Sequence, residues 1–471
     1  MNRTKIVATL GPASSSREQL SAMIGAGMNV ARINFSHSGA DEARELVKTI
    51  RELNDELGAN TAILADLQGP KIRVGEMAPN TVLESGQSFR FVTEECVGDS
   101  AVAYIQYDRF PADTNVGDRV LLDDGKLELV VKRTDGEHEV ETEVIHGGPL
   151  SSKKGVNLPN TQVSIPCLTE KDRRDLEVAI ELSVEWIGLS FVRSAEDVRL
   201  LKDIIRERQG TAKVVAKIEK PEAVADLDAI IRGADGLMVA RGDLGVEIPM
   251  EEVPIVQKLI VSNCRRVAKP VIIATQMMES MMSSTRPTRA EANDVANSVL
   301  DLADAVMLSG ETSVGNHPVR VIEAMSSIIR HSESSFKPKR RDNPPTEQND
   351  RYVSDTICYT ACKMASQIGA KAIITMTNSG YAGFKLSSHR PNTTICVFTD
   401  NRSILNMLSL VWGVRGFFYD GFVSTDDSVA DIQQVLIEQG FVEAGDMVIN
   451  TASMPMSVRG TTNALKISVI E

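Results

Sequence analysis

Two acidic residues, Glu219 and Asp243, stand where they could bind a hard metal ion, because each follows a short apolar, β-branched segment. Carboxylates from adjacent strands can converge on Mg²⁺ or Mn²⁺ and leave positions open for substrate oxygens and water. Two isolated acids are more commonly salt-bridged on a surface, but Lys217 and the backbone of Gly242 accompany this pair. We therefore predict a divalent metal site.

Basic residues near the ends of the apolar segments could bind phosphate. Lys217 lies two residues before Glu219, so both side chains point to the same face of a strand, where the ammonium could neutralise a migrating phosphoryl group. Arg32 and Arg73 could clamp phosphate through paired hydrogen bonds. A solvated lysine and surface salt bridges are the alternatives.

Three further residues, Thr275, Ser309 and Glu311, could relay a proton through hydroxyls and water. Helix capping is the alternative, and it is the more common role of each residue taken singly. The sequence has no GxxxxGK[ST] motif, so a nucleotide would be held without a P-loop. The phrase RGDLG at 241–245 is weak evidence by itself, since an exposed turn could carry it.

The apolar segments that precede these residues predict buried parallel strands, because polar turns and amphipathic stretches alternate with them. Eight such units are the number that closes a (β/α)₈ barrel, where chemistry sits at the C-terminal ends of the strands. Helix caps are predicted at Ser14–Ser16 and at Thr169. The eight segments are Lys5–Leu10, Asn29–Asn34, Thr61–Leu67, Trp186–Val192, Lys213–Glu219, Gly236–Arg241, Pro270–Thr275 and Asp304–Glu311.

Two regions depart from the barrel rhythm. Residues 70–164 carry short alternating segments and turn signals such as Asp135-Gly136, which predict a small all-β domain inserted on the catalytic face as a lid. A Pro-rich, charged linker at Lys337–Pro345 precedes a third, α/β domain. Within it we expect a helix at Tyr352–Ala365 and strands at Ala372–Met376 and Thr394–Phe398. The predicted boundaries are 1–69 and 165–336 for the barrel, 70–164 for the lid and 337–471 for the C-terminal domain.

The composition is that of a large globular protein of several domains: 471 residues, 42% of them hydrophobic. The formal net charge of −13 disfavours binding to nucleic acid or to an anionic membrane. Six scattered cysteines without metal-ligand spacing, and the lack of a signal-peptide or membrane-helix pattern, predict a cytoplasmic protein.

Several short sequence motifs, spread in order along the whole chain, resemble those of the pyruvate kinase family, most closely those of its bacterial members. The resemblance implies a Mg²⁺-dependent (or Mn²⁺-dependent) transfer of phosphate from phosphoenolpyruvate to ADP, giving pyruvate and ATP, on a barrel with an inserted lid and a regulatory domain. The matching phrases are TKIVATLGPAS (4–14), ARINFSH (31–37), DLQGPKIR (66–73), SKKGVNLP (152–159), AKIE (216–219), MVARGDLGVEIP (238–249), ATQMMESM (274–281), RPTRAE (286–291), DVAN (294–297) and MLSGET (307–312).

The resemblance also implies residue roles where the motifs match. Glu219 and Asp243 would bind the catalytic metal, and the amides of Gly242 and Asp243 the substrate carboxylate. Lys217 would stabilise the transferring phosphoryl group. The remaining roles are phosphate contact by Arg32, nucleotide binding by Asn34, His37 and Arg73, a place near the enolate for Thr275, and a proton relay through Ser309 and Glu311.

One departure from the family pattern concerns K⁺. Many members have Thr and Glu in the phrase that here reads DLQGPK, and those versions resemble the K⁺-requiring group. Lys71 can supply a fixed positive charge instead, so we predict activity without K⁺. The family's monovalent site nevertheless remains at Asn34, Ser36, Asp66 and Leu67. A second departure is Ser38, where the family usually has Gly beside His37.

The C-terminal domain is expected to bind an effector. Thr377, Asn378, Ser379 and Gly380 end a strand and open a helix, where amides and hydroxyls suit a phosphate, although a plain helix cap is the alternative. The resemblance implies an allosteric phosphosugar or nucleotide site here, with sugar monophosphates favoured, and a homotetramer.

Two rival functions remain at this stage. A metal-dependent barrel lyase or mutase acting on phosphoenolpyruvate or pyruvate would present similar groups but would need neither a lid nor ADP. A pseudo-enzyme that binds a partner would not need the complete set of charged residues seen here. A nucleic-acid module is disfavoured by the net charge and by an aromatic content of only 4%.

Overall fold

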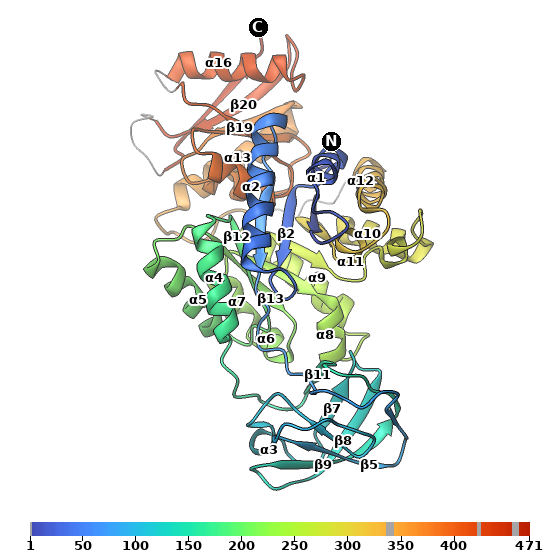
Figure 1. Ribbon diagram of the computed structural model, residues 1–471. Helices are drawn as coiled ribbons and strands as arrows, with labels where there is room; N and C mark the ends of the chain where they lie inside the picture. Colours follow the sequence, from blue (N-terminus) through green and yellow to red (C-terminus); the bar gives the residue numbers. More distant parts are fainter. Residues whose placement is uncertain (1, 336–342, 422–424, 455–460) are drawn as a thin grey trace.

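A computed structural model describes residues 2–335, 343–421, 425–454 and 461–471 of the chain, and Figure 1 shows three parts in a row. The barrel lies in the middle, the inserted all-β part at one end and the C-terminal α/β part at the other. The predicted linker lies largely in residues 336–342, outside the described residues. Within the described ranges no helix is long and apolar enough to cross a membrane.

All eight apolar segments form strands of one closed parallel barrel, which confirms the predicted fold class. Their order around the barrel is β1-β16-β15-β14-β13-β12-β3-β2, and β2 pairs with β1 to close it. The bounds are β1 Lys5–Thr9, β2 Val30–Asn34, β3 Ala62–Asp66, β12 Trp186–Leu189, β13 Lys213–Ile218, β14 Gly236–Ala240, β15 Val271–Ala274 and β16 Ala305–Leu308.

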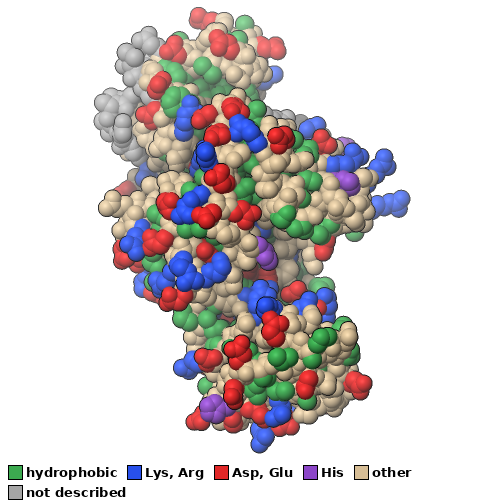
Figure 2. Space-filling view, viewed as in Figure 1, with side chains coloured by type: hydrophobic (Ala, Val, Ile, Leu, Met, Phe, Trp, Pro, Cys, Tyr) green, Lys and Arg blue, Asp and Glu red, His purple; other side chains and the backbone are tan. Residues whose placement is uncertain are grey.

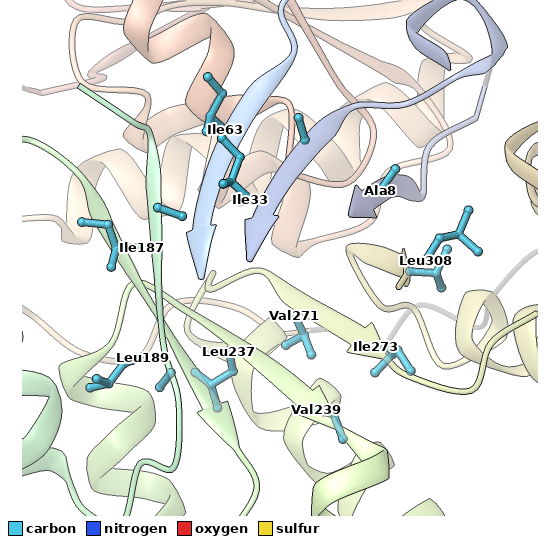
Figure 3. Close-up of a cluster of buried hydrophobic side chains, with 14 of the residues drawn as sticks. Ala8, Ile33, Ile63, Ile187, Leu189, Leu237, Val239, Val271, Ile273 and Leu308 are labelled. Atoms are coloured by element: carbon cyan, nitrogen blue, oxygen red, sulfur yellow. The ribbon is translucent and has the colours of Figure 1, made fainter. Parts of the chain in front are cut away.

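Helices cover the outside of the barrel, as a (β/α)₈ arrangement requires. Side chains such as Ile33, Ile187 and Val239 leave the strands on this outer face and pack with helix residues in one continuous apolar cluster (Figure 3). The helices are α1 Arg17–Ala26, α2 Ala40–Leu57, α4 Glu170–Glu181, α5 Ala195–Glu207, α6 Pro221–Ala225, α7 Leu227–Gly233, α8 Arg241–Glu247, α9 Val253–Arg266, α10 Arg289–Leu300, α11 Gly310–Ser313, α12 Pro318–Ser335 and the 3₁₀ helix η1 Glu279–Met282.

Both predicted helix caps are present. The Ser16 side chain accepts a hydrogen bond from the amide of Gln19 at the start of α1. Thr169 and Asp172 form a capping box at the start of α4, in which each side chain binds the other residue's backbone amide. These local signals fix where two helices begin.

Residues on the inner face of the strands change character along the barrel. Leu64 and Val215 are apolar and belong to a cluster that continues into the C-terminal part. Two positions further along the same strands stand Asp66 and Lys217, both buried. Because side chains two apart share a face of a strand, each strand carries an apolar residue in the barrel interior and a charged one at its C-terminal end.

The inserted part has its own apolar core, built on a six-stranded sheet of order β11-β7-β8-β9-β5-β6 and a two-stranded sheet of β10 and β4. The all-β prediction is correct apart from one four-residue helix, α3 Phe110–Asp113. A bridge between Arg73 and Gly155 joins the two chain segments that connect this part to the barrel. The strands are β4 Val82–Leu83, β5 Ser88–Val92, β6 Val102–Tyr104, β7 Arg119–Leu122, β8 Leu127–Thr134, β9 Glu139–His146, β10 Gly148–Pro149 and β11 Val156–Asn157.

The C-terminal part is a five-stranded sheet of order β19-β18-β17-β20-β21, in which only β21 is antiparallel to its neighbour. The predicted helix and the two predicted strands are found here as α13, β17 and β18, each within a few residues of the expected ends. The elements are α13 Tyr352–Ile368, β17 Ala372–Met376, α14 Tyr381–Ser388, β18 Thr394–Thr399, α15 Arg402–Leu408, β19 Val414–Phe418, α16 Thr425–Glu438, β20 Met447–Ala452 and β21 Ala464–Val469.

The C-terminal part docks against the N-terminal ends of the barrel strands through buried polar contacts. Trp186 at the start of β12 donates its indole N–H to the carbonyl of Met407, 3.1 Å away. Lys5 at the start of β1 donates to the carbonyl of Val414 over 2.8 Å. Asp304, just before β16, forms a 2.8 Å ion pair with Arg390, whose side chain is 4% exposed. This end of the barrel is therefore sealed by protein.

Candidate active site

Four charged side chains meet inside the C-terminal end of the barrel. Lys217 Nζ lies 3.3 Å from Asp66 Oδ1 and 3.1 Å from Glu219 Oε1. Asp66 in turn accepts a 2.7 Å hydrogen bond from Arg32 Nε, and Arg32 also donates to the hydroxyl of Thr9. The cluster brings four of the predicted site residues together: Arg32, Asp66, Lys217 and Glu219.

The charges in this cluster set the protonation of its members. Burial would raise the pKa of Asp66, but Lys217 and Arg32 outweigh it and hold that pKa below its usual value. Burial would lower the pKa of Lys217, but the Asp66 and Glu219 carboxylates keep it above its usual value. Burial raises the pKa of Glu219, Lys217 opposes this and the charge of Asp243 adds to it. Lys217 therefore stays an ammonium, and Glu219 is the carboxylate of the cluster whose charged form the surroundings stabilise least.

The two residues that follow strand β12 contribute groups that sequence reasoning missed. The Ser190 hydroxyl lies 2.8 Å from Lys217 Nζ, and the amide of Phe191 donates to Glu219 Oε2 over 2.7 Å. Gly188 on the same strand leaves room for Asp66, because a Cβ at this position would lie 2.8 Å from Asp66 Oδ1. The signal was present in the sequence, since Trp186, Gly188 and Ser190 share a face by their two-residue spacing.

The start of α8 is anchored to the end of β15. The hydroxyl of Thr275 accepts a 2.7 Å hydrogen bond from the amide of Gly242. Arg241 forms an ion pair with Asp294 and donates to the carbonyl of Thr275, so RGDLG is not an exposed turn here but opens a helix. Thr275 has φ of +68°, which is a strained conformation for a β-branched residue. Strained backbone conformations of this kind cluster at functional sites.

The residues of the predicted proton relay lie next to β16, and backbone amides occupy the carboxylate of Glu311. Glu311 is buried and accepts hydrogen bonds from the amides of Ser309 (2.7 Å) and Met278 (3.1 Å). These contacts favour the capping role for Glu311, and they hold the Ser309 backbone at the strand end. A relay through these residues stays a prediction.

Of the residues predicted for nucleotide and K⁺, Asp66 lies within the charged cluster, and Asn34 ends strand β2. The Asn34 side chain accepts a hydrogen bond from the amide of Ser36. Arg73 lies at the start of the inserted part and donates to the carbonyl of Lys153. Lys71 Nζ lies 3.4 Å from Asp243 Oδ1, so its charge sits beside a predicted metal ligand rather than beside Asp66.

The donor set suits a hard divalent ion. Glu219 and Asp243 supply carboxylate oxygens, with Lys217 3.1 Å from the first and Lys71 3.4 Å from the second, and the amide of Phe191 orients Glu219. Among the described residues no group of three or more His, Cys, Asp or Glu side chains could hold a metal alone. At phosphate sites Mg²⁺ is commonly held by one or two protein carboxylates, and substrate oxygens and water fill its other positions. The residues therefore fit Mg²⁺.

A cleft of about 1290 Å³ opens beside Asp243, between the inserted part and helices α8, α9 and α10. Its lining includes Lys71, Arg119, Arg241 and Lys258. Figure 2 shows basic side chains gathered at the narrow junction between the barrel and the inserted part. The same lining includes the acids Asp124, Glu128, Asp243, Glu247, Asp294 and Asp301, so the basic groups that could contact an anionic substrate stand among carboxylates.

The charged cluster, the barrel and the inserted part agree with known families. The family description "Pyruvate kinase, barrel domain" matches residues 1–322, and "Pyruvate kinase, alpha/beta domain" matches residues 355–468. The chain belongs to the pyruvate kinase family. The Corynebacterium glutamicum pyruvate kinase is 43% identical over 99% of this chain and 98% of its own length. The Mycobacterium tuberculosis pyruvate kinase is 42% identical over the same shares of the two chains.

The solved structures agree with this membership. A pyruvate kinase from Cryptosporidium parvum superposes with a TM-score of 0.93 at 32% identity, covering 100% of this chain and 96% of the other. Pyruvate kinases generally use Mg²⁺, and they convert phosphoenolpyruvate and ADP to pyruvate and ATP. The chain is accordingly a glycolytic phosphotransferase, and the lyase or mutase alternative is not favoured.

The predicted effector residues lie where β17 gives way to α14. The hydroxyl of Thr377 accepts hydrogen bonds from the amides of Gly380 (3.0 Å) and Ser379 (3.4 Å). Gly380 has φ of +79°, and a Cβ there would approach Met407 to 3.0 Å. The amides are thus capped locally, and an effector phosphate would have to displace Thr377 to reach them.

Proposed function

We propose that the charged cluster at the C-terminal end of the barrel transfers the phosphoryl group of phosphoenolpyruvate to ADP. The observation that carries this assignment is the position of Lys217: a buried ammonium within 3.3 Å of two carboxylates, kept charged by them. A fixed, desolvated cation is the group that stabilises charge on a phosphoryl group in transit.

Each predicted residue has a role that its surroundings support. Arg32 is held by Asp66 and Thr9 and presents its remaining guanidinium N–H groups to a phosphate. The amides at the start of α8, Gly242 and Asp243, would bind the substrate carboxylate once Thr275 releases the Gly242 amide. Mg²⁺ held by Glu219 and Asp243 would neutralise phosphate charge and orient the transferring group.

The inserted part would act as a lid over ADP. Arg73 lies at its connection to the barrel, Asn34 ends β2 and His37 follows it, and these three residues would contact the nucleotide. After transfer, the enolate carbon would take a proton at the site of Thr275, supplied through the relay of Ser309 and Glu311. We propose that the lid comprises residues 70–164.

The reaction is tested by ADP-dependent formation of pyruvate from phosphoenolpyruvate with Mg²⁺ in the assay. We expect turnover that needs both ADP and the metal. Pyruvate release without ADP would favour the lyase reaction instead, and no turnover under any salt condition would favour a pseudo-enzyme.

We also propose that turnover does not need K⁺, because the ammonium of Lys71 stands 3.4 Å from Asp243 and 3.8 Å from Asp124. A K⁺ ion at the Asn34, Ser36, Asp66 and Leu67 site would add a positive charge to the active site, and Lys71 supplies a fixed one from the Asp243 side instead. Equal turnover in K⁺ and in a bulky organic cation is expected. Lys71→Glu should create a K⁺ requirement, and a strong requirement in the unmodified protein would refute the proposal.

Regulation and assembly follow the family expectation. We propose a cytoplasmic homotetramer in which a sugar monophosphate binds the loop of Thr377, Asn378, Ser379 and Gly380. A titration of phosphosugars and nucleotides against the phosphoenolpyruvate saturation curve tests the site, with Thr377→Val as the variant that should lose the response. Light scattering tests the assembly. A curve that no phosphorylated compound shifts would remove the effector site.

A further inference from the structure

Glu247, at the end of α8, joins three parts of the chain through one buried carboxylate. Its side chain is 1% exposed, and its Oε1 accepts hydrogen bonds from Lys220 Nζ at 2.9 Å and from Asn157 Nδ2 at 2.8 Å. Lys220 directly follows Glu219, and Asn157 ends β11 of the lid. The carboxylate therefore connects the end of β13, helix α8 and the strand by which the lid returns to the barrel.

The position of Glu247 on α8 ties it to a predicted metal ligand. Asp243 lies four residues earlier on the same helix, one turn away. The start of this helix is already fixed by Arg241 and Thr275. Glu247 fixes the other end. It is therefore connected to both predicted metal ligands: to Asp243 through the helix, and to Glu219 through Lys220, the next residue in the chain.

The charges make the connection specific. Lys220 is buried, and a buried ammonium is costly unless a carboxylate accompanies it. Among the described residues, the carboxylate within ion-pair distance of Lys220 is that of Glu247. Neutralising Glu247 would thus leave a buried positive charge unpaired beside Glu219, whereas removing Asn157 would release only the lid.

A small cavity beside the same residues provides an independent observation. It measures about 30 Å³ and is lined by Asn157, Lys220 and Glu247 among others. Asn157 Oδ1 and Glu247 Oε2 are both buried and have no hydrogen-bond donor in the described part of the protein. A volume of this size has room for one water, which would supply the donor that a buried, unpaired oxygen needs.

We propose that Glu247 is a positioning residue, which with Lys220, Asn157 and one buried water sets the separation of the two metal-binding carboxylates and fastens the lid's return strand. The proposal rests on the proposed function. It assigns no chemistry to Glu247, which acts through its neighbours on Glu219 and Asp243.

The test measures metal binding directly, by the loss of the free Mn²⁺ electron paramagnetic resonance signal, together with amide hydrogen exchange in β11. Glu247→Gln should weaken Mn²⁺ binding about 10- to 100-fold, as expected when a group that orients metal ligands is lost, and should speed exchange in β11. Asn157→Ala should speed exchange in β11 with a smaller loss of Mn²⁺ affinity. The exposed acid Glu251 supplies the matched control, Glu251→Gln, which should change neither.

A folded Glu247→Gln variant that binds Mn²⁺ as tightly as the unmodified protein would overturn the proposal. If that variant does not fold, the double variant Glu247→Gln with Lys220→Met removes both buried charges and should fold, with Mn²⁺ binding weakened to a similar extent. Tight binding in the double variant would equally refute the role. A failed phosphotransfer assay would count against the proposed function alone, because the Mn²⁺ signal needs no turnover.

Discussion

Buried charges occur at both ends of the barrel, and they are used differently. At the N-terminal ends of the strands, Asp304 pairs with Arg390 and Lys5 donates to a backbone carbonyl, all within the protein. At the C-terminal ends, Lys217 and Glu219 belong to a cluster in which the pKa of Glu219 stays raised by burial and by Asp243. The Asp304–Arg390 pair is complete within the protein, whereas at the second end the neighbouring cations do not offset the burial of Glu219, which a bound metal ion would do.

The comparison separates stability from chemistry. Buried ion pairs that are complete within the protein hold domains together, and removing one partner costs folding energy. Charged groups that are balanced by a bound metal or substrate contribute to binding and catalysis rather than to folding. Substitutions at the two ends should therefore move different measurements, which the following four experiments examine.

The largest effect is expected at the catalytic end. Lys217→Met removes the cation from the cluster, so transition-state stabilisation is lost and kcat should fall about 10³-fold, close to 4 kcal/mol. Steady-state kinetics of pyruvate formation measure this. A Lys217→Met variant with near-normal kcat would show that the two ends do not differ in the way proposed.

The matching experiment at the other end is Arg390→Met, which leaves the Asp304 carboxylate buried without its cation. We expect the free energy of unfolding to fall by about 3 kcal/mol, with kcat unchanged per folded molecule. Urea unfolding followed by tryptophan fluorescence measures it, since both tryptophans of the chain, Trp186 and Trp412, lie at this interface. The exposed Arg402→Met is the control and should change little.

A smaller loss is expected from Trp186→Phe. The carbonyl of Met407 loses its 3.1 Å hydrogen bond and part of the packed indole disappears, which together should cost about 2 kcal/mol. Circular dichroism during thermal unfolding measures the change without relying on the removed fluorophore. Should the KM for phosphoenolpyruvate change as well, the N-terminal end would not be purely structural.

The smallest effect concerns Lys5. Burial and the charge of Arg415 lower the pKa of Lys5 well below its usual 10.5, so above that lowered pKa the folded protein binds fewer protons here than the unfolded chain. The free energy of unfolding should rise with pH from the lowered pKa up to 10.5. Lys5→Met should change stability at pH 7 by about 1 kcal/mol or less and remove this rise. Parallel urea titrations across alkaline pH compare the two proteins, and identical slopes would contradict the assignment.

Much of the fold was predictable because its signals are local. The eight strands follow from short apolar segments with turns between them, and two helix starts follow from Ser16 and Thr169. The short helix α3 in the lid was missed, since its four residues, Phe110–Asp113, are too few to show a helical period. Local patterns therefore describe elements well when those elements are long enough to repeat.

The site was predictable where its residues share a strand. Lys217 and Glu219 could be placed on one face by their spacing alone. The contact of Ser190 with Lys217 depends on the register between β12 and β13, and Asn157 and Glu247 meet although 90 positions separate them. Such contacts arise only once the barrel has closed and the lid is oriented, and the positive φ of Thr275 likewise reflects its surroundings.

The bridge between Arg73 and Gly155 has a consequence for how the chain folds. Neighbouring strands β3 and β12 must find each other across the whole insertion, and a hydrogen bond from Ile63 to Glu185 spans 122 positions. If the insertion folds first, its two ends already lie together at the bridge, and the loop left to close becomes about three times shorter. The saving in loop-closure entropy is about 1 kcal/mol. During synthesis the insertion emerges before the second half of the barrel, so this order of folding is also the order in which the segments become available.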